Sequence, residues 1–262
     1  MLFRMWKNWR RKKIKMRPFP PTWEKTIERL VPYYQSLSAT DRLELRGHIQ
    51  VFLAEKSFLG CGGLTVTEEM RVVIAAQACI LLLHRKSDYF PQLGSIYIYP
   101  HPYVAKTQRV LPGGIVEDRI EARVGESWHY GTVVLAWDNV LSGARDCNDG
   151  RNVVLHEFAH QLDAESDGTN GAPRLELRSQ YTAWAQVLST EFSLLNRDAQ
   201  LGRKSVLDKY GATNPAEFFA VATETFFEKP VQLKGKHPEL YDELKLFYCQ
   251  DPASYHKGSD AN

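Results

Sequence analysis

The sequence has few cysteines: only four among 262 residues, none of them in a CxxC pair. They are Cys61, Cys79, Cys147 and Cys249, each far from the next. This sparse spacing excludes a disulfide framework and a zinc site built from thiolates. It is typical of proteins from a reducing compartment, so we expect a cytoplasmic location.

Long apolar runs are also missing. The longest, VVIAAQACILLL at residues 72–83, is well short of the ~20 residues that a membrane span requires, and it contains Gln77. A buried helix is therefore the better interpretation of this run. Residues 1–17 contain neither an apolar core of signal-peptide length nor a small-residue cleavage site.

The sequence also lacks a strong net charge. The formal net charge is +2 with 24% charged residues, so no overall field favours nucleic acid, and we expect no direct nucleic-acid binding. The exception is the strongly basic segment 1–17, which also contains Phe3, Trp6 and Trp9. We interpret it as a solvated, partly disordered tail. Contact of this tail with a membrane surface or an acidic partner is the less favoured alternative.

The remaining composition predicts a folded enzyme-sized domain. With 44% hydrophobic residues, the chain can bury a substantial core. We predict one domain over 18–262, with a helical N-terminal part at about 18–92 and a catalytic part at about 93–252. Strands are expected at 95–105 and 131–139, where β-branched and aromatic residues concentrate. Helical patterns cover residues 23–59, 72–83, 153–163, 179–196, 213–230 and 237–251.

The stretch VVLHEFAHQLD, residues 153–163, carries the strongest chemical signal. His156 and His160 lie on one face of a helix, so both can bind a single zinc ion. Glu157 is turned about 100° from His156 and can act as general base toward a water beside the metal. Asp163 could orient a ligand histidine. The alternative is an amphipathic helix that matches this short pattern by chance.

A zinc site of this kind requires a third ligand. The HExxHxxGxxH ending is absent because Asp163 and Ser166 occupy its positions, and the thermolysin-like spacing leads to Gln180. Glu217, in the apolar stretch NPAEFFAVATE, is the better candidate. Glu224 lies two turns along the same face and could accept a hydrogen bond from a ligand histidine. The alternative for Glu217 is a carboxylate bonded to the amides at the start of its own helix.

Tyr210 stands seven residues before Glu217. A phenol near a metal can stabilise a developing oxyanion. Spacing alone does not distinguish this role from that of a packing or surface tyrosine.

VVLHEFAHQLD followed by YGATNPAEFFAVATETFF resembles the Mlc titration factor A family of bacterial zinc metallopeptidases, also called glucose-regulated metallopeptidases. The catalytic core of that family is similar to anthrax lethal factor. The resemblance covers about residues 21–252. It implies an α+β, mostly helical zincin-type fold with a small mixed sheet, and cytosolic aminopeptidase-type activity. It also implies one zinc ion per chain on His156, His160 and Glu217, with Glu157 as catalytic base and Tyr210 as transition-state residue.

The same resemblance implies a link to the glucose phosphotransferase system through binding of an Mlc-like transcriptional repressor. The alternative to a peptidase is therefore a non-catalytic regulatory protein that sequesters such a repressor. Glu157 favours catalysis, because a structural zinc site needs no base and usually has four protein ligands. For a peptidase, the substrate is a peptide or protein. An edge strand within 131–139 is expected to pair with it by β-addition.

Overall fold

The computed structural model describes residues 2–110, 116–123, 125–128, 131–166 and 168–255. The helices are α1 (Leu2–Lys15), α2 (Pro21–Leu30), α3 (Tyr33–Ser36), α4 (Ala39–Glu55), α5 (Glu68–Ile80), α6 (Trp137–Arg145), α7 (Val153–Asp163), α8 (Gln180–Gln200), η1 (a 3-10 helix, Lys209–Ala212), α9 (Pro215–Glu228), α10 (Pro230–Lys236), α11 (Pro238–Tyr248) and α12 (Pro252–Tyr255). The strands are β1 (Ser57–Gly60), β2 (Ser95–Tyr99), β3 (Tyr103–Val110), β4 (Val116–Arg123), β5 (Gly125–Trp128) and β6 (Thr132–Ala136). The mostly helical α+β fold predicted from the sequence is confirmed.

The central sheet has the strand order β1-β2-β6-β5. Strands β1, β2 and β6 are parallel, and β5 is antiparallel to β6. Strands β3 and β4 form a separate antiparallel pair. In the register of β2 and β6, Ile96 lies opposite Val133 and Ile98 opposite Leu135, and all four side chains are fully buried. The sheet is thus small and mixed.

The predicted edge strand within 131–139 is wrong. Strand β6 ends at Ala136, where α6 begins, and it pairs with β2 on one side and β5 on the other. Its run of buried apolar residues is the pattern of a strand covered on both faces. Among the described strands, the edge beside α7 is β5.

The buried helix predicted for 72–83 is confirmed over α5, whose residues from Met70 to Ile80 are nearly all inaccessible to solvent. The helical pattern over 23–59 is divided into α2, α3 and α4, and ends in strand β1. Pro32 disfavours helical geometry at the residue before it. Ser38 starts α4 by accepting a hydrogen bond from the Asp41 amide at 3.1 Å. No helix among the described residues is long and apolar enough to cross a membrane.

The basic N-terminal segment is not a solvated tail: residues 2–15 form helix α1, which packs on α4. Arg11 is 6% exposed. Its Nε and Nη2 donate to the carboxylate of Glu55 at 2.8 and 2.7 Å, and its Nη1 donates to Asp88 Oδ1 at 2.5 Å. Ile14 is buried beside it in the core. The prediction failed because these partners are distant in sequence and invisible in a local charge pattern.

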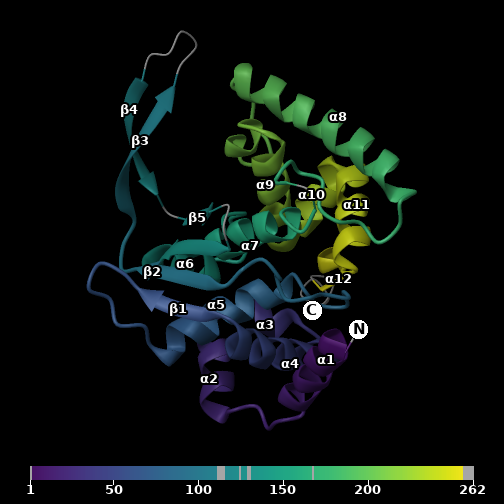
Figure 1. The fold of residues 1–262 in the computed structure, drawn as a ribbon. Helices are drawn as coiled ribbons and strands as arrows, with labels where there is room; N and C mark the ends of the chain where they lie inside the picture. The colour runs from purple at the N-terminus through teal and green to yellow at the C-terminus, as the bar shows by residue number, and fades with distance from the viewer. Residues whose placement is uncertain (1, 111–115, 124, 129–130, 167, 256–262) are drawn as a thin grey trace, which may run out of the picture.

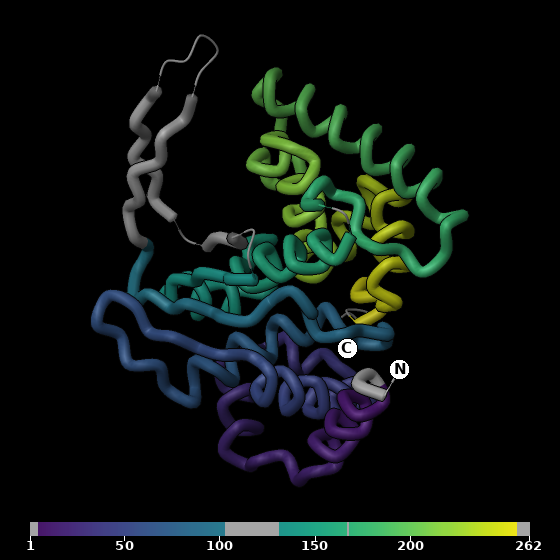
Figure 2. The backbone as a smooth tube through the Cα atoms, viewed as in Figure 1, coloured from purple at the N-terminus to yellow at the C-terminus, as the bar shows by residue number. Residues whose placement is uncertain are grey.

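The helices divide into two groups around the sheet. Helices α1, α2 and α4 lie together on one side, and α8, α9 and α11 lie on the other, as the course of the chain in Figure 2 shows. Helix α7 sits beside the sheet and packs against α9 (Figure 1). This arrangement brings two segments some sixty residues apart in sequence to one place.

Candidate metal centre

Asn152 fixes the start of α7. Its side-chain oxygen accepts hydrogen bonds from the amides of Val154 and Leu155, both at 3.1 Å. Its side-chain nitrogen donates to Gln77 Oε1 of α5 at 2.9 Å and to the Gly143 carbonyl of α6 at 3.1 Å. An N-cap with these extra bonds orients the whole helix relative to α5 and α6.

The opposite faces of α7 have different surroundings. Phe158 is fully buried, and its ring lies 4.8 Å from that of Phe90 and 5.6 Å from that of Phe52, centroid to centroid. Because Phe158 is held in the core, His156 and His160 face α9 on the other side of the helix. Their ring centroids are 4.9 Å apart.

His156, His160 and Glu217 form a group that can hold a metal ion. Glu217 Oε2 lies 3.0 Å from His156 Nε2 and 3.5 Å from His160 Nε2. One ligand atom from each residue lies within 4.8 Å of the others. A tetrahedral zinc ion with bonds of about 2.0–2.2 Å keeps its ligand atoms roughly 3.3–3.5 Å apart. Two imidazoles and one carboxylate thus suit zinc in both chemistry and spacing, and they leave a fourth position open.

The carboxylate of Glu217 is directed at the histidines and not at its own helix. Asn214 caps α9 by accepting a hydrogen bond from the Glu217 amide at 3.0 Å, and Pro215 occupies the first helical position. The side-chain oxygen of Asn214 therefore does the capping. This leaves the Glu217 carboxylate free of that function.

Glu224 connects the ring of His156 to the start of α7. Its Oε1 lies 2.6 Å from His156 Nδ1, and its Oε2 accepts a hydrogen bond from the Asn152 amide at 2.6 Å. A carboxylate on Nδ1 fixes the ring orientation so that Nε2 faces Glu217. The sequence predicted that Glu224 contacts a ligand histidine; the contact with His156 is present, and its role in metal binding stays a prediction.

The charges of this group are strongly linked. Burial lowers the pKa of His156, but hydrogen bonds with Glu217 and Glu224 outweigh it and raise that pKa well above its usual value. Burial raises the pKa of Glu217, but the two histidines outweigh it and lower that pKa to about 2. A metal ion must displace the proton on His156, so its binding releases a proton.

Glu157 lies beside this group and is 5% exposed. Its Oε2 is buried and has no hydrogen-bond partner among the residues that the structure describes. Burial raises the pKa of Glu157, although His156 and His160 oppose the rise. A buried carboxylate oxygen without a partner is costly, and a water molecule beside the metal position would satisfy it.

Asp163 has a different role from the one predicted. It is fully buried, and its Oδ2 accepts a hydrogen bond from the Gly171 amide at 2.7 Å. Its Oδ1 is buried without a hydrogen-bond partner in the described part of the chain. Asp163 therefore holds the loop after α7 and does not hydrogen-bond a histidine ring. Gly171 has a positive φ of 77°, and an added Cβ would lie 2.4 Å from the Pro215 carbonyl oxygen.

Tyr210 lies at the edge of the site, in η1. Its ring centroid is 5.9 Å from that of His156, and the side chain is 56% exposed. Sequence spacing alone did not determine this position. A partly exposed phenol next to a candidate ligand can reach a bound molecule.

Arg151 and Asp208 form a link that sequence reasoning missed. Arg151 Nε and Nη2 donate to Asp208 Oδ2 at 3.0 and 2.7 Å. Asp208 Oδ1 in turn accepts a hydrogen bond from the Tyr210 amide at 2.9 Å. The residue just before the cap of α7 is thus connected to the short helix that carries Tyr210. No local pattern indicates this pair, because its members are 57 residues apart.

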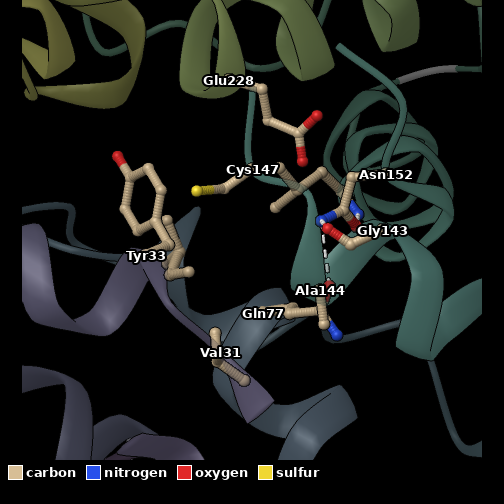
Figure 3. Close-up of a pocket in the computed structure, with 10 residues that line it drawn as sticks. Val31, Tyr33, Gln77, Gly143, Ala144, Cys147, Asn152 and Glu228 are labelled. Carbon is tan, nitrogen blue, oxygen red and sulfur yellow. Dashed lines mark hydrogen bonds between the residues drawn. The ribbon is translucent and has the colours of Figure 1, made fainter. Parts of the chain in front are cut away.

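A small cavity lies between α3, α5, α6 and α9, and Asn152 at the start of α7 also lines it (Figure 3). Tyr33 and Glu228 face it, and both Tyr33 Oη and Glu228 Oε1 are buried without hydrogen-bond partners among the described residues. The other oxygen of Glu228 accepts a hydrogen bond from the Arg151 amide at 2.9 Å. Burial, with a further contribution from Glu224, raises the pKa of Glu228 to about 9. The space has room for about one water molecule.

Glu228→Gln is expected to flatten the pH dependence of stability. The folded protein keeps the Glu228 proton up to a pKa of about 9, whereas the unfolded chain releases it near 4.5. Between these values the folded state binds more protons, so the free energy of unfolding falls as pH rises. We expect denaturant unfolding of the metal-free variant to show a smaller fall than wild type from about pH 5 to about pH 8. Glu176→Gln, at an exposed position, is the control; identical slopes for all three proteins would contradict the prediction.

Comparison with known proteins gives one family and several relatives. Residues 6–249 match the family described as glucose-regulated metallo-peptidase M90. An uncharacterized protein of Synechocystis sp. (strain ATCC 27184 / PCC 6803 / Kazusa) is 41% identical over 248 residues, which cover 94% of this chain and 90% of the relative. Mlc titration factor A of Serratia proteamaculans (strain 568) is 33% identical over 224 residues, covering 82% of this chain and 84% of the relative. Mlc titration factor A of Klebsiella pneumoniae (strain 342) is 31% identical over 235 residues, covering 88% and 86%.

Proposed function

The chain belongs to the glucose-regulated metallopeptidase M90 family, and from this membership we propose that it is a zinc-dependent peptidase of the aminopeptidase type that acts in the cytoplasm. One observation supports the proposal most strongly. The trio His156, His160 and Glu217, with nitrogen–oxygen distances of 3.0 and 3.5 Å, lies beside Glu157, whose Oε2 has no hydrogen-bond partner in the described part of the chain. A catalytic zinc site needs three protein ligands, an open position and a nearby base.

A zinc ion held by His156, His160 and Glu217 would polarise the scissile carbonyl and lower the pKa of a water molecule beside it. Glu157 would take the proton of the attacking water and return it to the leaving amine. Burial supports this role, because it raises the pKa of Glu157 and so makes its carboxylate a stronger base. Glu224 would keep the ring of His156 oriented during these steps.

Tyr210 would donate a hydrogen bond to the oxygen that becomes negative when the carbonyl is attacked. The ring lies next to His156, on the exposed edge of the site. The contact of Asp208 with both Arg151 and the Tyr210 amide would hold η1 in position for this.

Tyr210→Phe is expected to lower kcat by about 10²- to 10³-fold, the usual cost of losing one oxyanion donor. Zinc content should not change, because the phenol is not a ligand in this scheme. Asp208→Asn should lower kcat by a smaller factor. It weakens the contacts that hold η1 in position but leaves the phenol of Tyr210 in place. Steady-state kinetics with metal analysis measures both. Loss of zinc from the Phe variant would show that Tyr210 supports the metal group instead.

The substrate we propose is an extended peptide or protein segment. Strand β5 lies beside α7 and, among the described strands, pairs only with β6. Its second edge can accept a peptide strand by backbone hydrogen bonding. A peptide bound there would lie next to the metal group.

The aminopeptidase type rests on the resemblance of the two sequence motifs. An enzyme of this type requires the free amino group of its substrate. We therefore expect hydrolysis of aminoacyl chromogenic substrates and none of their N-acetylated forms. Equal rates on both would retain the peptidase and reject the aminopeptidase type.

A second candidate function is the binding of an Mlc-like transcriptional repressor. It is favoured by the two relatives named Mlc titration factor A, at 31% and 33% identity. Regulation through the glucose phosphotransferase system would follow from such binding. Binding and hydrolysis can coexist, and Glu157→Gln separates them. A purely regulatory protein would bind the repressor and show no hydrolysis in either form.

A further inference from the structure

Helix α1 concentrates the positive charge of the protein. Of the 33 Lys and Arg residues, eight lie in residues 1–17, which contain no Asp or Glu. The other 245 residues therefore carry 25 basic and 31 acidic side chains, a net formal charge of −6. An acidic body with one strongly basic helix has a directional field that the total of +2 conceals.

The outer face of α1 carries large exposed apolar side chains among its basic ones. Met5, Trp6 and Trp9 of α1, and Met16 directly after its end, are 62%, 54%, 55% and 75% exposed. The Met16 amide donates to the Lys12 carbonyl at 3.2 Å, so the helical turn extends to Met16. At about 100° per residue, Met5, Trp9 and Met16 then point within about 40° of one another and form a single stripe. Isolated exposed apolar residues are ordinary, but several large ones gathered on one face indicate a contact surface.

Basic side chains flank this stripe on both sides. Lys13 and Lys15 lie about 80° to either side of Met5 around the helix. Lys12 is exposed within the stripe, and Lys13 Nζ lies 3.7 Å from the ring centroid of Trp9. Long basic side chains beside tryptophan can cover an apolar surface with their stems and keep their charges in water.

The inner face of α1 fixes the helix to the protein. Arg11 makes its hydrogen bonds with Glu55 and Asp88 while lying 4.5 Å above the ring of Tyr89, and Lys7 Nζ is 2.9 Å from Asp88. Arg11 and Lys7, the basic residues of the inner face, are thus paired with acidic side chains of the protein. The stripe on the outer face is consequently held in place on a folded helix.

We propose that α1 docks this protein on a membrane surface that contains anionic lipids. The exposed methionines and tryptophans would enter the boundary between headgroups and acyl chains, and Lys12 and Lys13 would contact the anionic headgroups. Tryptophan prefers this boundary because its ring is apolar with a polar edge. The helix would lie in the plane of the surface without crossing it.

The observations favour a lipid surface over nucleic acid. Single-stranded nucleic acid would use the tryptophans for stacking, but it gives no reason for Met5 and Met16 to share their stripe. The sequence alone disfavoured membrane contact because it predicted a solvated tail, which has no fixed face. The ordered helix removes that objection. Figure 1 shows α1 at the opposite end of the molecule from α8 and α9, so docking would leave the metal group accessible.

Vesicle sedimentation of the full chain tests the proposal. We expect wild type to sediment with phosphatidylcholine vesicles that contain phosphatidylglycerol and to stay in solution with phosphatidylcholine alone. The double variant Trp6→Ser/Trp9→Ser should bind at least about tenfold more weakly, because two large apolar side chains are lost. Lys12→Gln/Lys13→Gln should lose roughly 25-fold, at about fivefold for each charge near an anionic surface.

Leu201→Ser/Leu246→Ser, at exposed apolar positions outside α1, is the matched control and should bind like wild type. Unchanged thermal midpoints will show that the variants fold. As a second measurement, brominated lipids should quench tryptophan emission of wild type but not of the Trp6→Ser/Trp9→Ser variant. The proposal fails if wild type does not bind the anionic vesicles, if both α1 variants bind them as wild type does, or if the helix binds single-stranded oligonucleotides instead.

Discussion

Glu157→Gln is expected to lower peptide hydrolysis by about 10²- to 10⁴-fold, the contribution of a positioned general base. Glutamine has nearly the same shape as glutamate but cannot take a proton at neutral pH. The change falls on a carboxylate whose Oε2 is buried without a hydrogen-bond partner among the described residues. The loss should appear in kcat, because the proton is transferred in the transition state.

Metal content separates this result from a structural failure. Glu157 is not one of the three candidate ligands, so the variant should contain as much zinc as wild type. Because burial raises the pKa of Glu157, removing its charge should not destabilise the fold. A variant that hydrolyses peptides at the wild-type rate would show that Glu157 is not the base. A variant that loses zinc would place Glu157 in the metal group itself.

Glu217→Ala should abolish stable zinc binding and, with it, activity. The substitution removes the carboxylate that lies 3.0 and 3.5 Å from the two histidine nitrogens. Two imidazoles four residues apart on a helix can bind zinc only weakly without it. Titration with a competing chelator, followed by metal analysis, measures the loss. Unchanged zinc content would mean that another residue provides the third ligand.

Glu224→Gln provides a graded comparison. Its carboxylate contacts His156 Nδ1 and not the metal position, so we expect zinc affinity to fall by about 10- to 100-fold, less than for Glu217→Ala. Glu176→Ala, at an exposed position after α7, is the control and should bind zinc like wild type. If Glu217→Ala and Glu224→Gln lowered zinc affinity equally, Glu217 could not be distinguished as a ligand from Glu224 as a residue that only orients His156.

The sequence was informative about the elements that carry strong local patterns. The apolar run at 72–83 and the helical pattern over 213–230 both predicted helices that the structure contains, α5 and α9. The spacing of His156 and His160 placed both rings on one face, where they now meet Glu217. Their roles as ligands stay predictions. Each of these signals lies within a few turns of a single helix, which is why sequence alone could reveal it.

Features that depend on distant partners were missed or wrong. Helix α1 was expected to be a tail, because its fixation depends on Glu55 and Asp88, 44 and 77 residues from Arg11. Strand β6 was expected at an edge of the sheet. The structure pairs it with β5, and the sequence pattern of β6 does not reveal that neighbour. The Arg151–Asp208 pair was not anticipated for the same reason. Local patterns specify elements well, but long-range pairing requires the assembled fold.

Hydrolysis of an aminoacyl chromogenic substrate before chelation, after chelation and after addition of zinc tests the central claim most directly. The claim is that His156, His160 and Glu217 hold a metal ion on which peptide hydrolysis depends. We expect chelation to abolish hydrolysis by wild type and zinc to restore it, while Glu217→Ala stays inactive throughout. A rate that is the same in all three conditions would contradict the claim.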